Sequence, residues 1–346
     1  MAMAKRSYSK RVKNMEPAVQ NITVTIAPGR NYIDLSQIAS LVNRRFYRQG
    51  INWAVAGFKV YKPTPTESGA SGIVISKLPN TWVMANSWMK SFKTWQKMND
   101  ESLEETESVR AKFLDFKIYM NNFHHDAGFI GNVLPQAANG DVAIPGEWEA
   151  SKIYIPDTST PGTIDIRELV AVGQNFPGNS GATGYNAVSL IEGYAASRGL
   201  PNILDPNTPS DADDASGTSP ENWMVALFND GTTQDTAVLT DMITDNNVAP
   251  YPFENGPNPT AGVPGNPYPD PFVDTMYPNG ANQMDGLELV DVSYFNAGTN
   301  ANTLNLKGDN FPCGLIEVVA SEECGMIIHL IPGHHRGYLC EPMTEM

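Results

Sequence analysis

Nine short runs of this sequence have the pattern of β-strands, and they constrain the fold more than any other feature. The clearest is Asn21–Gly29, in which Ile22, Val24 and Ile26 alternate with polar residues before Pro-Gly ends the run. The other eight are Ile51–Lys62, Gly72–Leu78, Phe113–Met120, Ser151–Pro156, Ile166–Gly173, Gly286–Phe295, Cys313–Ala320 and Gly325–Ile331. The runs do not alternate with helices and do not repeat, which favours antiparallel pairing. We therefore expect an all-β fold, a single jelly-roll antiparallel β-sandwich with long loops and a few short helices.

Two longer segments have helical spacing instead. The first begins at Asp34, where Gln37 completes a capping-box pattern, and its apolar period continues to Gly50. The second runs from about Thr81 to Met98, and its stripe of tryptophan and phenylalanine predicts a core face rather than a ligand platform. Shorter helices are predicted at Asn186–Ser197, Asn222–Phe228 and Thr236–Thr244.

Charge is distributed unevenly along the chain. The formal net charge is −15, yet residues 1–62 contain eleven Lys and Arg against two acids. Further along, Gly199–Leu306 contains neither Lys nor Arg. This uneven distribution of charge predicts one face of the protein that binds nucleic acid and another that does not.

Most of these cations belong to two groups. Residues 1–18 are predicted to be a disordered arm that follows a polyanion, and its cations are Lys5, Arg6, Lys10, Arg11 and Lys13. The second group is Arg44, Arg45 and Arg48, at the end of the first predicted helix. It is either a solvated helix end or a second phosphate-contact patch.

The rest of the chain, 19–346, is predicted to be one domain with a long acidic surface insertion at about 174–284. The three cysteines, an odd number without framework spacing, suggest a reducing compartment. No apolar run approaches the roughly 18 residues of a membrane span, so no membrane partner is expected.

The C-terminal run Phe311–Met343 resembles the end of capsid proteins of circular, Rep-encoding single-stranded DNA viruses, notably environmental and marine ones. In that group a final strand leads into a Pro-Gly turn and an RGYL stretch, here Pro332-Gly333 and Arg336–Leu339. The segments Leu78–Asp100 and Gly146–Pro156 are similar to the same group.

This resemblance implies a jelly-roll coat protein that self-assembles into an icosahedral shell, in its smallest form about 60 copies with T=1 symmetry. The basic arm would lie inside, on a packaged single-stranded DNA genome, and an unknown host receptor would bind outside. The expected locations are the virion and, during assembly, the host nucleus or cytoplasm. No enzymatic activity, catalytic residue or cofactor is expected. Five arm cations in about 60 copies supply only roughly 300 charges, so we expect Arg44, Arg45 and Arg48 to face the interior as well.

One motif points to a serine protease instead. Gly178–Gly181 reads GNSG. A histidine and then an aspartate precede Ser180, which is the chain order of the catalytic triad in chymotrypsin-like enzymes. The candidate partners are His124 or His125 and Asp141 or Asp165. The spacing argues against this class, because too few residues separate His125 from Ser180 for the intervening barrel strands.

Two groups of residues have metal-binding side chains without a metal-binding spacing. Cys324, His329, His334, His335 and Cys340 offer thiols and imidazoles for zinc, but no C-x2-C or H-x3-H pair is present. Asp211, Asp213 and Asp214 are weak candidates for calcium, because the rest of the EF-hand pattern is missing. We expect no bound metal.

The alternative from another functional class is a carbohydrate-binding or adhesin-like β-sandwich. Its sugar platform would be the Trp-rich and Tyr/Asn/Asp-rich segments, and the basic arm would have no role in it.

Overall fold

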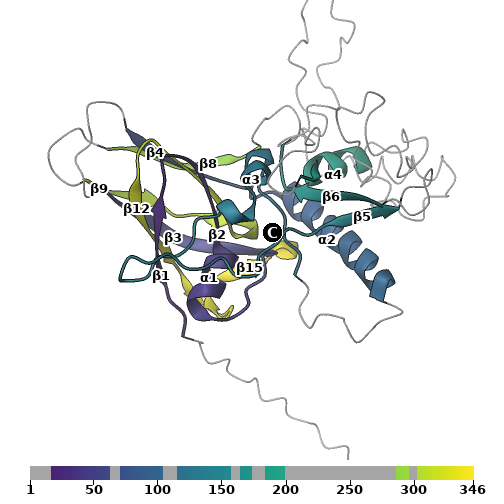
Figure 1. The fold of residues 1–346 in the computed structure, drawn as a ribbon, viewed down its shortest axis with the longest axis horizontal. Coiled ribbons are helices and arrows are strands. Elements are labelled where there is room, and N and C mark those ends of the chain that lie inside the picture. The colour runs from purple at the N-terminus through teal and green to yellow at the C-terminus, as the bar shows by residue number, and fades with distance from the viewer. Residues whose placement is uncertain are drawn as a thin grey trace, which may run out of the picture.

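The described chain is built around two antiparallel sheets that face each other (Figure 1). The computed structural model describes residues 17–62, 71–103, 115–156, 164–173, 184–198, 286–295 and 302–346. The first sheet has the order β1-β12-β3, with three further strands paired along β3; its members are β1 (Asn21–Ile26), β12 (Cys324–Leu330), β3 (Ile51–Lys62), β9 (Asn302–Lys307), β10 (Asn310–Phe311) and β15 (Cys340–Pro342). The second sheet contains, in order, β2 (Gly29–Asp34), β11 (Leu315–Ala320), β4 (Gly72–Lys77) and β8 (Glu288–Tyr294). The expected mainly β architecture with antiparallel sheets and few helices is confirmed.

In the sandwich, β1 and β2, β3 and β4, and β11 and β12 are consecutive in the chain but lie in different sheets. β1 pairs with β12 in the first sheet, whereas β2 and β11 pair in the second. One strand of this pair crosses between the sheets at Ala27-Pro28, and the strand paired with it crosses at Ser321–Glu323. Gly29, at the first crossing, has φ +98°, a conformation in which a side chain would be strained. A two-stranded ribbon therefore bends over the edge of the sandwich.

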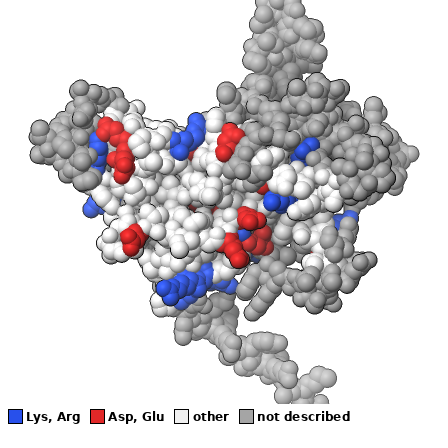
Figure 2. Space-filling view, viewed as in Figure 1, with Lys and Arg blue, Asp and Glu red and all other residues white. Residues whose placement is uncertain are grey.

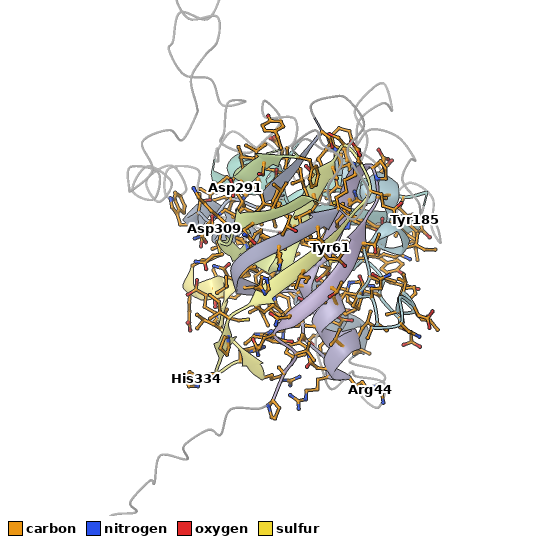
Figure 3. All side chains as sticks on the ribbon, turned by 90° about the vertical axis from the view of Figure 1, so that its left-hand side faces the viewer. Arg44, Tyr61, Tyr185, Asp291, Asp309 and His334 are labelled. Carbon is orange, nitrogen blue, oxygen red and sulfur yellow. The ribbon has the colours of Figure 1, made fainter. Side chains whose placement is uncertain are left out.

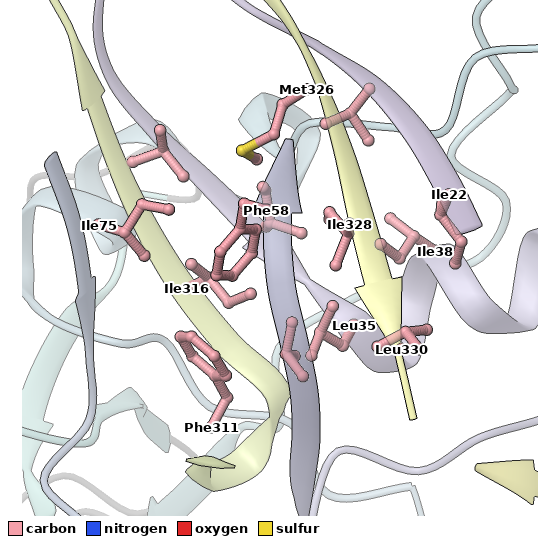
Figure 4. Close-up of a cluster of buried hydrophobic side chains, with 14 of the residues drawn as sticks. Ile22, Leu35, Ile38, Phe58, Ile75, Phe311, Ile316, Met326, Ile328 and Leu330 are labelled. Atoms are coloured by element: carbon pink, nitrogen blue, oxygen red, sulfur yellow. The ribbon is translucent and has the colours of Figure 1, made fainter. Parts of the chain in front are cut away.

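The core lies between the two sheets (Figure 4). Alternate residues of each strand point inward, so Val24 and Met326 of one sheet share a buried cluster with Ile75 and Ile316 of the other. Phe58 and Phe311 form an edge-to-face pair with ring centroids 5.7 Å apart. The α1 helix (Leu35–Asn43) adds to the same cluster with its buried residues, among them Leu35 and Ile38.

Between β4 and β8 the chain forms a second, smaller unit beside the sandwich (Figure 1). Its described elements are α2 (Trp82–Leu103), α3 (Asn122–Ala127), a three-stranded sheet of β5 (Ile153–Pro156), β6 (Ile164–Val170) and β7 (Asn186–Ser189), and α4 (Leu190–Arg198). The expected core role of the tryptophan stripe on α2 is confirmed, because Trp88 is buried and stacks on Phe92 at 5.1 Å. Of the predicted acidic insertion, only residues 184–198 are described.

Two helix predictions need correction. The first helix begins after Asp34 as predicted, but it ends at Asn43 and not at Gly50, because Arg44 turns into the left-handed region. The capping box is also incomplete: the Asp34 carboxylate accepts from the Gln37 amide, while the Gln37 side chain donates to Pro145 O. The predicted helix Asn186–Ser197 has two parts, since its first four residues form β7.

The strand predictions fail at three places. Residues 115–120 of the predicted strand Phe113–Met120 form only an isolated bridge, between Tyr119 and Val170. β2 was not predicted, because its polar residues follow directly on the Pro-Gly signal that ends β1. β9 and the short strands β10 and β15, all paired with β3, were not predicted either.

Candidate nucleic-acid interface

The arginines predicted to contact phosphate lie on a loop that is fixed against α1. Ser40 Oγ accepts from the Tyr47 amide at 2.9 Å, and Ser36 Oγ donates to Arg48 O at 3.1 Å. The loop after the helix therefore returns along its side. Arg44 and Arg48 are exposed and Arg45 is half-buried.

The base of the N-terminal arm lies against this loop. Arg45 donates to Pro17 O at 2.9 Å, and the Val19 amide donates to Asn43 Oδ1 at 3.0 Å. The ring of contacts is closed by Tyr338, whose hydroxyl accepts from Asn43 Nδ2 and donates to Val19 O, both at 2.7 Å. Burial raises the pKa of Tyr338 to about 12, so the hydroxyl keeps its proton at neutral pH.

A short hairpin from near the C-terminus forms the other side of the arm base. It consists of β13 (Pro332–Gly333) and β14 (Gly337–Tyr338), with Arg336 between them. Gln20 Nε2 donates to Gly337 O at 3.1 Å, and the Leu330 amide donates to Gln20 O at 2.8 Å. The arm base is thus held between α1 and this hairpin.

We call this region the basic end: Arg44, Arg45, Arg48, Arg336 and the arm base Pro17–Gln20. Figure 2 shows a group of Lys and Arg side chains at the lower end of the molecule, below the position of α1. In Figure 3, Arg44 and His334 lie at the lower end, while Asp291 and Asp309 lie toward the upper end. The structure therefore brings the predicted arginines together with the arm base. The arm cations Lys5, Arg6, Lys10, Arg11 and Lys13 lie outside the described residues.

Arg44 occupies a backbone conformation that normally favours glycine. Its φ is 54° and ψ is 41°, and its amide closes the helix by donating to Ser40 O. For a residue with a Cβ this conformation costs about 1 kcal/mol or more. An arginine at this position keeps a cation at the helix end despite that cost.

Arg44→Gly should therefore change stability and DNA binding in opposite directions. We expect a gain of about 1 kcal/mol in the free energy of unfolding, because glycine relieves the strain. Affinity for single-stranded DNA should fall, because one cation is lost. Urea unfolding and fluorescence anisotropy measure the two effects. Arg44→Ala is the matched control, since it loses the same charge and keeps the strain; equal stability of the two variants would contradict the prediction.

The histidines of the protease hypothesis are interior residues. His124 is buried; its Nδ1 accepts from the Met120 amide at 3.0 Å, and its Nε2 contacts Asn132 Oδ1 at 2.8 Å. Burial lowers the pKa of His124 to about 3, so the ring is neutral with its proton on Nε2. His125 is also buried and contacts the buried Glu168 carboxylate at 2.8 Å. Neither ring presents a nitrogen to a solvent-exposed substrate.

Of the other members of the proposed triad, only Asp141 has a side chain that the structure describes. Asp141 is exposed and accepts from Asn139 Nδ2. Asp165 lies in β6, its side chain not among those described, and Gly178–Gly181 with Ser180 lies outside the described residues.

The zinc candidates are spread over three elements. Cys324 and His329 are at opposite ends of β12, roughly 17 Å apart at the rise of an extended strand. His334 and His335 belong to the hairpin, and Cys340 to β15. Burial raises the pKa of the Cys324 thiol to about 11 and of the Cys340 thiol to about 12, which disfavours the thiolates that zinc binds. Within the described ranges, no group of three metal-binding side chains comes together. Asp211, Asp213 and Asp214 lie outside them.

The described tryptophans pack inside the fold and do not form an exposed platform. In the part of the chain that the structure describes, every tryptophan side chain is buried or half-buried. Trp148 is held by a hydrogen bond from its Nε1 to Asp34 Oδ2 at 3.0 Å. The described tryptophans therefore have packing roles, and the Tyr/Asn/Asp-rich segments of the carbohydrate-binding hypothesis lie largely outside the described residues.

Arg336 was not predicted as a site residue. In the sequence Arg336 stands out only as part of the RGYL stretch, while its neighbour at the basic end, Phe46, is 290 residues away in the chain. No local pattern could have joined them.

Comparison with known proteins identifies no relative: no family model, curated protein or solved structure matches this chain. Among the described helices, none has both the length and the apolar character needed to cross a membrane.

Proposed function

We propose that this protein is a viral coat protein that self-assembles into an icosahedral shell and packages single-stranded DNA. In this proposal the N-terminal arm and the basic end face the interior of the shell. The stretch Gly199–Leu306 has no cations, and apart from β8 and β9, which belong to the sandwich, it is assigned in this proposal to the outer surface, where it does not attract the packaged genome.

The strand pairing supports a jelly roll as the shell domain. A jelly roll forms when a long two-stranded ribbon folds on itself, so that its first strand pairs with the eighth, the second with the seventh, and so on inward. Here the pairs are β1 with β12, β2 with β11, β3 with β9, and β4 with β8. The resulting orders, β1-β12-β3-β9 and β2-β11-β4-β8, are those expected of such a ribbon. Coat proteins of many icosahedral viruses use this fold, and the fold alone does not identify a function.

The observation that carries the proposal is the position of the arm base. Pro17, Val19 and Gln20 are tied to the elements that carry Arg45 and Arg336. The cations of residues 5–13 are therefore attached beside a folded surface of the same sign. This arrangement suits phosphate neutralisation without base recognition, since Arg and Lys bind backbone phosphates of any sequence.

Electron microscopy of the purified full-length protein tests the proposal. We expect closed shells of uniform diameter, and nuclease-resistant nucleic acid inside those assembled with DNA. A protein that stays monomeric at every salt concentration would contradict it. Binding to a glycan array without particles would support the carbohydrate-binding alternative.

A further inference from the structure

We propose that Arg336 is a phosphate-binding residue, and that the β13–β14 hairpin forms the second wall of the single-stranded DNA path at the basic end. The inference rests on the proposed function and extends it, because it assigns a residue and an element that neither the arm nor the α1 loop contains.

The first support is the location of the Arg336 side chain. Its guanidinium donates to Phe46 O, and its own carbonyl accepts from the Tyr47 hydroxyl at 2.9 Å. Phe46 directly follows Arg45 and lies two residues before Arg48. The hairpin arginine therefore docks onto the loop that carries the other three arginines.

The second support is the chemistry of the guanidinium. It is a planar fork with five N–H donors, suited to bind phosphate oxygens in pairs. The contact with Phe46 O orients this fork and engages only part of its donor capacity. The side chain is half-buried, so its remaining surface meets solvent. An oriented and partly exposed arginine loses less conformational entropy on binding phosphate than a free one.

The third support is the backbone conformation. Arg44, Cys313 and Arg336 are the non-glycine residues with positive φ in the described part of the chain, and two of these three belong to the basic end. Arg336 has φ 50° and is followed by Gly337, which has φ 102°. Strained conformations of residues with side chains concentrate at functional sites. At both places an arginine occupies a position that glycine would fill with less strain.

The fourth support is continuity with the arm. The hairpin residues Gly337 and Tyr338 bind Gln20 and Val19, so the arm leaves the domain directly beside Arg336. A strand of DNA bound by the arm meets α1 on one side and the hairpin on the other. The phosphate path then includes Arg44, Arg45 and Arg48 on the first wall and Arg336 on the second.

The test is the salt dependence of binding by the full-length protein. The probe is a fluorescent thymidine oligonucleotide, with its association constant measured by anisotropy over a range of NaCl concentrations. Each phosphate contact contributes about 0.7 to the slope of log K against log salt for single strands. We expect Arg336→Gln to lower the slope by about 0.7 and Arg336→Lys to keep it. Lys59→Gln, which removes an exposed cation on β3, should leave it unchanged.

A second measurement uses the wild-type protein and so does not depend on a variant that folds. Phenylglyoxal modifies accessible arginines, and mass spectrometry locates the products. The oligonucleotide should protect Arg336 and Arg44, and should not protect Arg30, which lies at the far end of β2 from α1.

The outcomes distinguish the assignment of Arg336 from the DNA-packaging function on which it rests. An unchanged slope for Arg336→Gln, or unprotected Arg336 beside protected Arg44, overturns the assignment of Arg336 alone. A wild-type protein whose binding of DNA does not depend on salt overturns both the DNA-packaging function and this inference.

Discussion

Replacing Arg44, Arg45 and Arg48 together by glutamate should abolish packaging of single-stranded DNA while leaving the fold intact. Loss of three phosphate contacts lowers the salt slope by about 2, which at 0.15 M salt weakens binding on the order of 50-fold. The three new carboxylates add repulsion to that loss. Anisotropy with an oligonucleotide measures the affinity, and the ratio of absorbance at 260 and 280 nm measures the nucleic acid in assembled particles.

The matched control for this variant reverses three exposed lysines elsewhere, Lys59, Lys93 and Lys307. It changes the net charge by the same amount on the outer face of the first sheet and on α2. We expect only a small loss of affinity, because screening limits the reach of a surface charge to about 8 Å at physiological salt. Equal losses in the two triple variants would mean that net charge, and not the basic end, determines binding.

The second large effect is expected at Asp34, which connects three parts of the fold. Its buried carboxylate caps α1 by accepting from the Ser36 and Gln37 amides, and it also accepts from Gln49 Nε2 and Trp148 Nε1. Asp34→Ala leaves these four donors without their acceptor. We expect a loss of about 3 to 5 kcal/mol in the free energy of unfolding, measured with urea at pH 7.

The same carboxylate makes the effect depend on pH. Burial raises the pKa of Asp34 from 3.8 to about 6, although its hydrogen bonds oppose the rise. The folded protein then binds a proton more tightly than the unfolded chain, so the contribution of Asp34 to stability falls as pH rises from about 4 to 6. The stability difference between wild type and Asp34→Ala should be about 2 kcal/mol larger at pH 4 than at pH 7.

The variant Asp34→Asn is the corresponding control for the pH effect, because it leaves no titrating group at this position. The amide that it introduces keeps one acceptor for the helix cap, so this variant should be less destabilising than alanine at pH 7. A gap between wild type and Asp34→Asn that stays constant with pH would show that Asp34 does not titrate in this range.

Sequence patterns predicted the elements whose signal is local. β3 was predicted with its observed ends, because alternating apolar residues continue from Ile51 to Lys62 and breakers flank them. β11 and β12 were predicted to within two residues for the same reason. The core role of Trp88 followed from helical spacing, which places its ring on the apolar side of α2.

The missed features depend on contacts between distant segments. The apolar period of α1 continues through Phe46, but the helix ends before Arg44, whose backbone is left-handed. The chain that follows places Tyr47 against the hairpin. β7 resembles the start of a helix until it pairs with β6. The sequence predicted that Arg45 and the arm have the same charge and bind the same polyanion. It did not predict that Arg45 donates a hydrogen bond to Pro17 O, because that contact depends on the fold.

The pairing of β1 with β12 has a consequence for the timing of folding. Asn21 is paired with His329, so the first strand has no partner until about 300 further residues have been made. At ribosomal rates of about 5 to 20 residues per second this takes about 15 to 60 seconds. During that interval the basic N-terminal segment has already been made, while the strand that will pair with β1 has not. The basic N-terminal segment therefore precedes the finished domain in time, and the first sheet can close on β1 only after β12 has been made.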